Sequence, residues 1–321
     1  MANPAAVAPV GAPFVIDPVL TAIAIAYRNP KLIADLVSPR VTVGRSIFRY
    51  TIYPKGEAFT VPDTHVSRKA RPNQVEVTST SMQGHTEDFA LDDPVPQEDI
   101  DNAGPNQDPL GRATLRVSDL IELDREIRIA TMIFDASQYA TGNKISLSGT
   151  SQWSDYTTGV SDPVKDIRVA MSACVMRPNI MVIGRPAYDV MSSHPKILKA
   201  VFRNLGDSGI ARKQDVIDLF QLDDIIIGEG WINTAHKGQT PILSRVWGGS
   251  AALIYQDKTA DTDGGTTFSY TAQFKTRVAG TIPDANMGAY GGQWVRAAES
   301  VKEIICAADL GYLIEDCVTY P

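Results

Sequence analysis

The residue types that most often do chemistry are few in this chain and widely spaced. No two of its four histidines stand at the helical spacing of a zinc site: His65, His85, His194 and His236. Its three cysteines form no C-x-x-C pair and lie in apolar runs, where a thiol is unreactive: Cys174, Cys306 and Cys317. Neither the G-x-S-x-G turn of a serine hydrolase nor the G-x-x-x-x-G-K-[ST] phosphate loop occurs. We therefore predict no catalytic residue, no metal ligand and no cofactor, and hence a protein that is not an enzyme.

One short motif keeps an alternative open. Gly228-Glu229-Gly230 follows a predicted buried strand at 224–227 and begins like a dinucleotide-binding turn. The third glycine position holds Asn233, and the polar stretch after it is a poor start for the helix whose N-terminus would face the phosphates. We interpret the two glycines as a simple turn, with a nucleotide-binding α/β enzyme as the alternative.

Length and charge limit the remaining classes. A chain of 321 residues suggests two subdomains, or one domain with long excursions. A net charge of −7 gives no basic surface for sequence-independent phosphate binding. No apolar run is long enough to span a membrane, and no basic segment follows Met1, so we expect neither a membrane span nor a signal peptide. The expected place of synthesis is the cytoplasm.

The element that must organise the chain is one long amphipathic helix, predicted over 108–139. Apolar residues recur there at intervals of three or four, between acids and arginines. Pro109 near the start and Gly142 beyond the end are typical helix-boundary residues. Such a helix would be about 45 Å long at 1.5 Å per residue, so we expect it to lie on a sheet and to contact a further element.

An extended two-stranded hairpin is predicted before this helix. Residues 46–53 and 74–81 alternate apolar and polar side chains, as half-buried strands do. Between them lies a polar tip of about 20 residues, and a hairpin without a second layer is marginal in water by itself. We therefore expect the hairpin, like the uncharged arm at 1–14, to lie on neighbouring subunits.

Charge is segregated along this part of the chain. Residues 44–72 carry six bases and two acids, whereas residues 87–108 carry eight acids and no base. This separation predicts head-to-tail pairing between copies, although each charge could also simply face solvent. The candidate contact residues are Lys55, Arg68, Lys69 and Arg71 in the hairpin, with Asp92, Asp93, Glu98 and Asp99 as acceptors.

The second half of the chain reads as a compact α/β subdomain followed by strands. Helices are predicted at 162–174, 186–203 and 214–220, and buried strands at 179–183 and 224–227. Asp162-Pro163 is a capping acid followed by proline at the first helical position. Strands dominate after 245, and we expect them to form the sheet under the long helix. The predicted class is α+β.

The order of these parts resembles the major capsid protein of tailed bacteriophages, which has the Hong Kong 97-type fold. The resemblance lies in WSDYTTGVSDPVKDIRVAMSACVMRPNIMVIGRPAYDVMSSHPKI at 153–197, NPKLIADLVSPRVTVGRSIFRYTIY at 29–53 and DLGYLIEDCV at 309–318. It implies an N-terminal arm at 1–44, an extended loop at 45–92 and a peripheral domain with the long helix at 93–159. It further implies an axial domain at 160–288 and C-terminal strands of the peripheral domain at 289–321.

The resemblance also implies a function. Copies would form the hexamers and pentamers of an icosahedral head that encloses double-stranded DNA without sequence-specific binding, in a virion assembled in the host bacterial cytoplasm. Expected partners are other copies, a separately encoded scaffold and a portal, and no membrane; whether a decoration protein also binds stays open. An encapsulin-type nanocompartment shell, which shares the fold, remains an alternative. Lys55 or Lys69 could cross-link to a neighbour, but salt bridges are the expected role.

Overall fold

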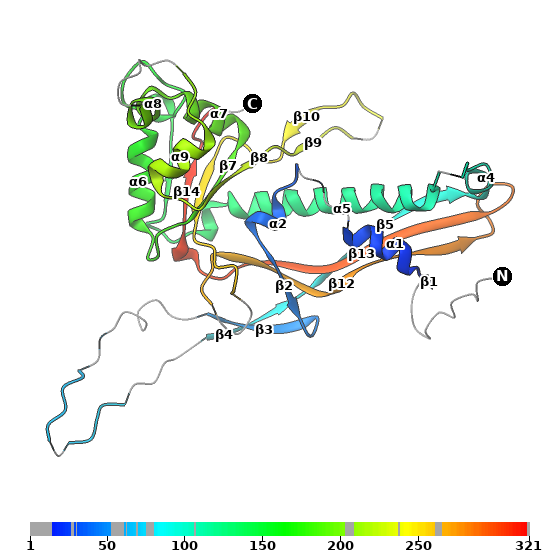
Figure 1. Cartoon of the computed structure of the whole chain (residues 1–321), viewed down its shortest axis with the longest axis horizontal. Coiled ribbons are helices and arrows are strands. Elements are labelled where there is room, and N and C mark those ends of the chain that lie inside the picture. Colours follow the sequence, from blue (N-terminus) through cyan, green and yellow to red (C-terminus); the bar gives the residue numbers. More distant parts are fainter. Residues whose placement is uncertain are drawn as a thin grey trace.

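The computed structural model describes residues 15–26, 29, 31–52, 61, 63–68, 70–74, 80–105, 107–202, 209–236, 238–260 and 265–319. In these residues the chain forms a long-helix unit, built on α5 (Pro109–Ile133), and a compact unit of sheet and helices at one end of it (Figure 1). Two hairpins extend from these units: β3 (Ile47–Ile52) with β4 (Thr80–His85), and β9 (Trp231–Asn233) with β10 (Leu243–Arg245). We call the first the extended hairpin and the second the short hairpin.

Local signals fix the ends of α5. The Asp108 carboxylate accepts a hydrogen bond from the backbone N–H of Gly111 at 2.9 Å, and Pro109 occupies the first turn, as predicted. The helix ends at Ile133 and not near 139, because the Tyr139 hydroxyl donates to the Ile133 carbonyl at 2.7 Å and satisfies one of the last free carbonyls. Its 25 residues are still long for a globular helix.

The sheet of the long-helix unit is built from strands in the first third and the last sixth of the chain. Its strands run in the order β1–β12–β13–β5, and β2 pairs with β12. The strands are β1 (Val15–Ile16), β2 (Arg40–Val43), β5 (Glu87–Pro96), β12 (Ser269–Asp284) and β13 (Gly292–Ile305). The accompanying helices are α1 (Pro18–Ala26), α2 (Ala34–Val37) and α4 (Gln97–Asp101). The helix α5 lies along β5 and β13, as the amphipathic pattern predicts.

The compact unit has its own sheet, in the order β6–β14–β11–β7–β8, flanked by helices. The strands are β6 (Lys144–Ser146), β7 (Ile180–Gly184), β8 (Asp224–Gly228), β11 (Ala251–Ile254) and β14 (Gly311–Glu315). The helices are α6 (Pro163–Ala173), α7 (Arg185–Ser193), α8 (Pro195–Phe202) and α9 (Lys213–Phe220). Short 3-10 turns lie at η1 (Ala136–Gln138), η2 (Gly149–Ser151) and η3 (Ala308–Leu310).

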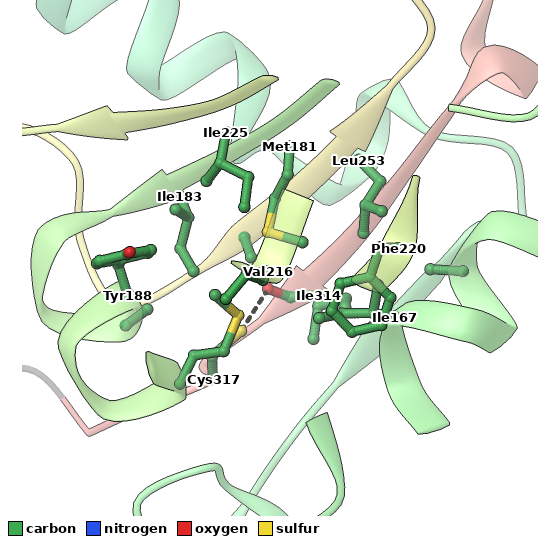
Figure 2. Packing of buried hydrophobic residues seen from close by; sticks show 14 of the residues in the cluster. Ile167, Met181, Ile183, Tyr188, Val216, Phe220, Ile225, Leu253, Ile314 and Cys317 are labelled. Atoms are coloured by element: carbon green, nitrogen blue, oxygen red, sulfur yellow. Dashed lines mark hydrogen bonds between the residues drawn. The ribbon is translucent and has the colours of Figure 1, made fainter. Parts of the chain in front are cut away.

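The core of the compact unit is apolar and continuous. Figure 2 shows Met181, Ile183 and Ile225 of the parallel pair β7 and β8 beside Leu253 and Ile314 of the neighbouring strands. Each of these side chains is at most 5% exposed, consistent with strands that are covered on both faces. This core makes the compact unit a rigid base for its helices and for the short hairpin.

Strand pairing corrects the expectation that all C-terminal strands lie under the long helix. β12 and β13 do so, but β14 pairs with β11 and β6 in the compact unit. Alternation and burial identify β14 as a strand without saying which sheet it joins. The expected boundaries 160–288 and 289–321 therefore separate β12 from β13, which are paired along most of their length.

The returning strand of the extended hairpin is described only in part. It was predicted at 74–81, whereas β4 spans Thr80–His85, with residues 75–79 outside the described part. The register pairs Ile47 with His85 and Ile52 with Thr80. The part of the prediction that rests on Val75 and Val77 lies outside the described residues.

Candidate interaction surfaces

The extended hairpin is anchored to the long-helix unit by aromatic packing. Phe48 is 8% exposed and lies in a cluster with Tyr270, Ala272 and Ile304, and Tyr50 packs against the same cluster. A Cβ atom at Gly84, the cross-strand partner of Phe48, would lie 2.5 Å from the Phe48 ring. Glycine is therefore needed where the ring crosses β4. This anchor holds the base of the hairpin against the sheet.

The basic tip extends away from the rest of the chain. Arg68 and Arg71 are exposed, and among the described residues neither forms an ion pair. Lys55 and Lys69, the other two candidate bases, lie outside the described residues. The described part of the tip lies beyond β3 and β4, far from both units (Figure 1).

The four candidate acceptors fall into two pairs. Asp92 already binds Arg296 through both oxygens, at 2.7 and 2.6 Å, and Asp93 contacts Arg116 at 3.1 Å. Glu98 and Asp99 stand in the first turn of α4, and neither has an ion-pair partner in the described part of the chain. Asp92 and Asp93 lie in β5, which leads into α4, and α4 with Glu98 and Asp99 lies at one end of the molecule (Figure 1). Glu98 and Asp99 are the more available pair.

A buried ion network joins α5, the segment before β2 and the sheet, and sequence reasoning missed it. Arg277 donates to Glu122 and to Glu299, both at 3.0 Å, and Arg40 donates to Glu299 at 2.9 Å. Arg125, only 1% exposed, pairs with Asp35. Burial alone would raise the pKa of the Asp35 carboxyl, but the charges of Arg125 and Arg40 lower it to about 2.

A signal for this network does exist in the sequence. Ser118, Glu122, Arg125 and Ile129 recur at intervals of three or four, so they share one face of α5 with apolar residues. All four are buried. Charged residues within an apolar stripe indicate buried pairing, but the sequence did not show which partners would pair with them.

Glu126 joins three separate elements. Its carboxylate accepts hydrogen bonds from the backbone N–H groups of Ile33 and Ala34, at 2.9 and 2.7 Å, and from Trp247 Nε1 at 2.5 Å. Ile33 and Ala34 begin α2, and Trp247 lies just before β11 of the compact unit. Burial raises the pKa of Glu126, while these hydrogen bonds oppose the rise. This residue therefore ties the two units to the N-terminal segment.

Comparison with known proteins decides the family. No protein-family profile matches the chain. The major capsid protein of Pseudomonas phage JBD67 is 50% identical over 307 residues, which are 96% of this chain and 98% of that protein. The chain belongs to the family of phage major capsid proteins.

Solved structures agree on the fold of this capsid protein. A phage-related protein from Bordetella bronchiseptica RB50 superposes with a TM-score of 0.73 at 23% identity, covering 95% of this chain and 98% of that one. The capsid of cyanophage P-SCSP1u gives 0.58 at 10% identity, over 90% and 89%. The fold is therefore of the Hong Kong 97 type, as the sequence predicts.

The turn that suggested a nucleotide site has another explanation in the capsid protein. A Cβ atom at Gly228 would lie 2.1 Å from the Trp247 ring, and one at Gly184 would lie 1.8 Å from the Gly248 carbonyl oxygen. The 247–248 segment therefore crosses the carboxyl ends of β7 and β8, where a phosphate would have to approach. Gly228 makes room for a tryptophan that is fully buried.

The histidines and cysteines of the capsid protein occupy ordinary structural positions. His194 is buried; its Nδ1 accepts from the Lys196 N–H at 3.1 Å, so Nε2 carries the proton toward Ser161 Oγ at 3.2 Å. Cys174 and Cys317 are buried free thiols, and burial raises the pKa of Cys306 to about 12. In the described ranges no three His, Cys, Asp or Glu side chains cluster as metal ligands, and no helix is long and apolar enough to cross a membrane.

His194 should make the capsid protein sensitive to acid. Burial and the Lys196 charge lower the pKa of His194 from 6.5 to about 4, with the Asp162 charge opposing them. The stability that comes from the neutral ring is fully present above about pH 6.5 and is lost as the pH falls toward 4, by about 2 kcal/mol at pH 4.5. Denaturant unfolding at pH 7 and pH 4.5 measures this loss.

The control for this pH effect is His194→Asn. Asparagine offers Lys196 an acceptor but does not titrate, so its stability should fall less between the two pH values. An equal fall in both proteins would show that other groups cause the acid sensitivity.

Proposed function

We propose that copies of this capsid protein form the hexamers and pentamers of an icosahedral shell that encloses double-stranded phage DNA. In this arrangement the compact unit is the axial domain, near the centre of each capsomer, and the long-helix unit is the peripheral domain. The extended hairpin of each copy lies over the acidic surface of the next copy. The arm at 1–14 then contacts neighbouring capsomers.

The observation that carries this proposal is the extended hairpin itself. Its base is fixed by Phe48 and Tyr50, yet its basic tip lies far from α4 of its own chain, which carries Glu98 and Asp99 (Figure 1). The tip and the acids lie toward opposite ends of the molecule, so contact between them requires two copies arranged head to tail. Such heterologous contacts close into rings when the rotation between copies allows it.

Charge reversal at the tip tests the contact. Arg68→Glu with Arg71→Glu should lower particle yield about tenfold, because like charges would then face Glu98 and Asp99 of the next copy. Particle yield is measured by sedimentation and electron microscopy after co-expression with the other head proteins of the phage. The matched control is Lys258→Glu, an exposed base outside the tip. Wild-type yield from the tip variant would refute the pairing, and the soluble fraction distinguishes failed assembly from misfolding.

Further partners follow from the same proposal. We expect a separately encoded scaffold and a portal, with assembly in the host bacterial cytoplasm. The net charge of −7 suits an interior that holds DNA without binding it tightly. The ultraviolet absorbance ratio of native particles tests the contents, since DNA-filled heads and a protein-filled nanocompartment absorb differently.

A further inference from the structure

The short hairpin carries an apolar surface that the chain itself leaves uncovered. Trp231 pairs with Arg245 and Asn233 pairs with Leu243, so these four side chains share one face of the two strands. Trp231 is 48% exposed and Leu243 is 63% exposed. The Arg245 guanidinium lies 4.1 Å from the centre of the Trp231 ring and holds it in place. Two strands without a second layer are marginal in water, so this face needs a cover.

A groove of matching character lies between α6 and α8. Its volume is about 840 Å³, and its floor is formed by small and apolar side chains: Val164, Val169, Ala173 and Ala200. Val169 is 49% exposed. Its rim is mainly basic, with Lys165 and Arg168 from α6 and Lys196 and Lys199 from α8. One acid, Asp162, also lines it and pairs with Lys196 at 3.1 Å. The groove therefore suits an apolar side chain that has acidic neighbours.

Acidic neighbours stand beside the short hairpin. Asp189 and Glu229 both contact Arg185 at 2.9 Å, and their side chains remain 56% and 46% exposed. Glu229 lies two residues before Trp231. A basic rim would meet these carboxylates when the hairpin enters the groove, which adds charge complementarity to the apolar match.

The positions of the two features exclude a contact within one copy and fit a contact between copies. In Figure 1 the helix α6 and the extended hairpin lie toward one end of the molecule and α4 lies at the other, whereas the short hairpin extends from the compact unit toward the middle, on the side away from α6. The groove is therefore on the outer side of the compact unit, and the short hairpin extends from the opposite side of that unit, in the direction of α4. A single head-to-tail arrangement would engage both pairs of surfaces together.

We propose that the short hairpin of one copy docks in the groove between α6 and α8 of the next copy, with Leu243 and Trp231 against Val169. This inference rests on the proposed shell function, because it assigns the contact that closes each ring of subunits. Trp231 stacked on Arg245 is the kind of preorganised aromatic anchor that dominates protein interfaces.

Paired cysteines test the contact in assembled particles. Val169→Cys combined with Leu243→Cys should give, after mild oxidation, a ladder of covalent species that ends at five or six subunits on a non-reducing gel. The matched control combines Val169→Cys with Ser244→Cys, because Ser244 lies on the opposite face of β10. Particles that give no ladder, or a ladder that stops at dimers, would overturn the docking arrangement.

A charge substitution provides an independent readout. Leu243→Lys should reduce particle yield about tenfold, since lysine would meet the basic rim, whereas Ser244→Lys should assemble like the wild type. Equal yields from both variants would refute the contact. The wild-type chain separates the two proposals: if it forms no shell under these conditions, the proposed function fails, whereas normal shells from both it and Leu243→Lys reject only the docking.

Discussion

Gly184→Ala should strongly destabilise the compact unit. An added Cβ would lie 1.8 Å from the Gly248 carbonyl oxygen and 2.7 Å from the Trp247 carbonyl oxygen. Both are backbone atoms, which cannot rotate away as a side chain can, so either β7 or the 247–248 segment must move. We expect a loss of about 3 kcal/mol or more in the free energy of unfolding, measured by denaturant titration.

Gly248→Ala is the matched control for this substitution. An added Cβ there has no heavy atom within 4 Å, so stability should change little. Both variants add one methyl group, Gly184→Ala on β7 and Gly248→Ala on the segment that crosses β7. Near-wild-type stability of Gly184→Ala would show that the backbone of residues 247–248 leaves room for a methyl group beside β7.

Glu126→Leu should reduce the free energy of unfolding by a similar amount, for a different reason. Leucine has a similar size but accepts no hydrogen bond, so the N–H groups of Ile33, Ala34 and Trp247 would all lose their acceptor. Each unsatisfied buried donor costs about 1–3 kcal/mol, and we expect about 4 kcal/mol in total. Denaturant unfolding followed by tryptophan fluorescence measures the loss and reports on Trp247.

Two further variants separate lost hydrogen bonds from lost charge. Asp124→Leu removes an exposed carboxylate from the same helix, one that pairs with Arg128, and should cost less than about 1 kcal/mol. Glu126→Gln keeps one acceptor oxygen, so its loss in the free energy of unfolding should lie between those of Glu126→Leu and Asp124→Leu. If Glu126→Leu were as stable as Asp124→Leu, Glu126 would not be the joint between the units.

Signals that act within a few residues were readable from the sequence. Asp108-Pro109 and Asp162-Pro163 predicted helix starts, and in both cases the aspartate accepts a hydrogen bond from a backbone N–H three residues on. The apolar periodicity of α5 and the buried strands β7 and β8 was equally clear. The resemblance to phage capsid proteins rested on such short segments in a fixed order.

Features that depend on partners far away in the sequence could not be predicted. The burial of Arg125 depends on Asp35 and Thr271, which lie 90 and 146 residues away. The role of Gly228 depends on Trp247, and a glycine before a turn predicts a phosphate site equally well. The short hairpin and its groove were missed because exposure of Leu243 and Val169 appears only once the strands and helices are placed.

The sheet under α5 also constrains the order in which the chain can fold. Asp92 of β5 bonds Arg296 of β13, 204 residues later, and Glu122 bonds Arg277, 155 residues later. When a ribosome has just made α5, the strand β5 is complete, but β13, the other strand on which the helix lies, is still unmade, and Glu122 does not yet have Arg277 as its partner. The long-helix unit can therefore fold completely only after its C-terminal strands have been synthesised. Assembly of one copy with another must wait until that point.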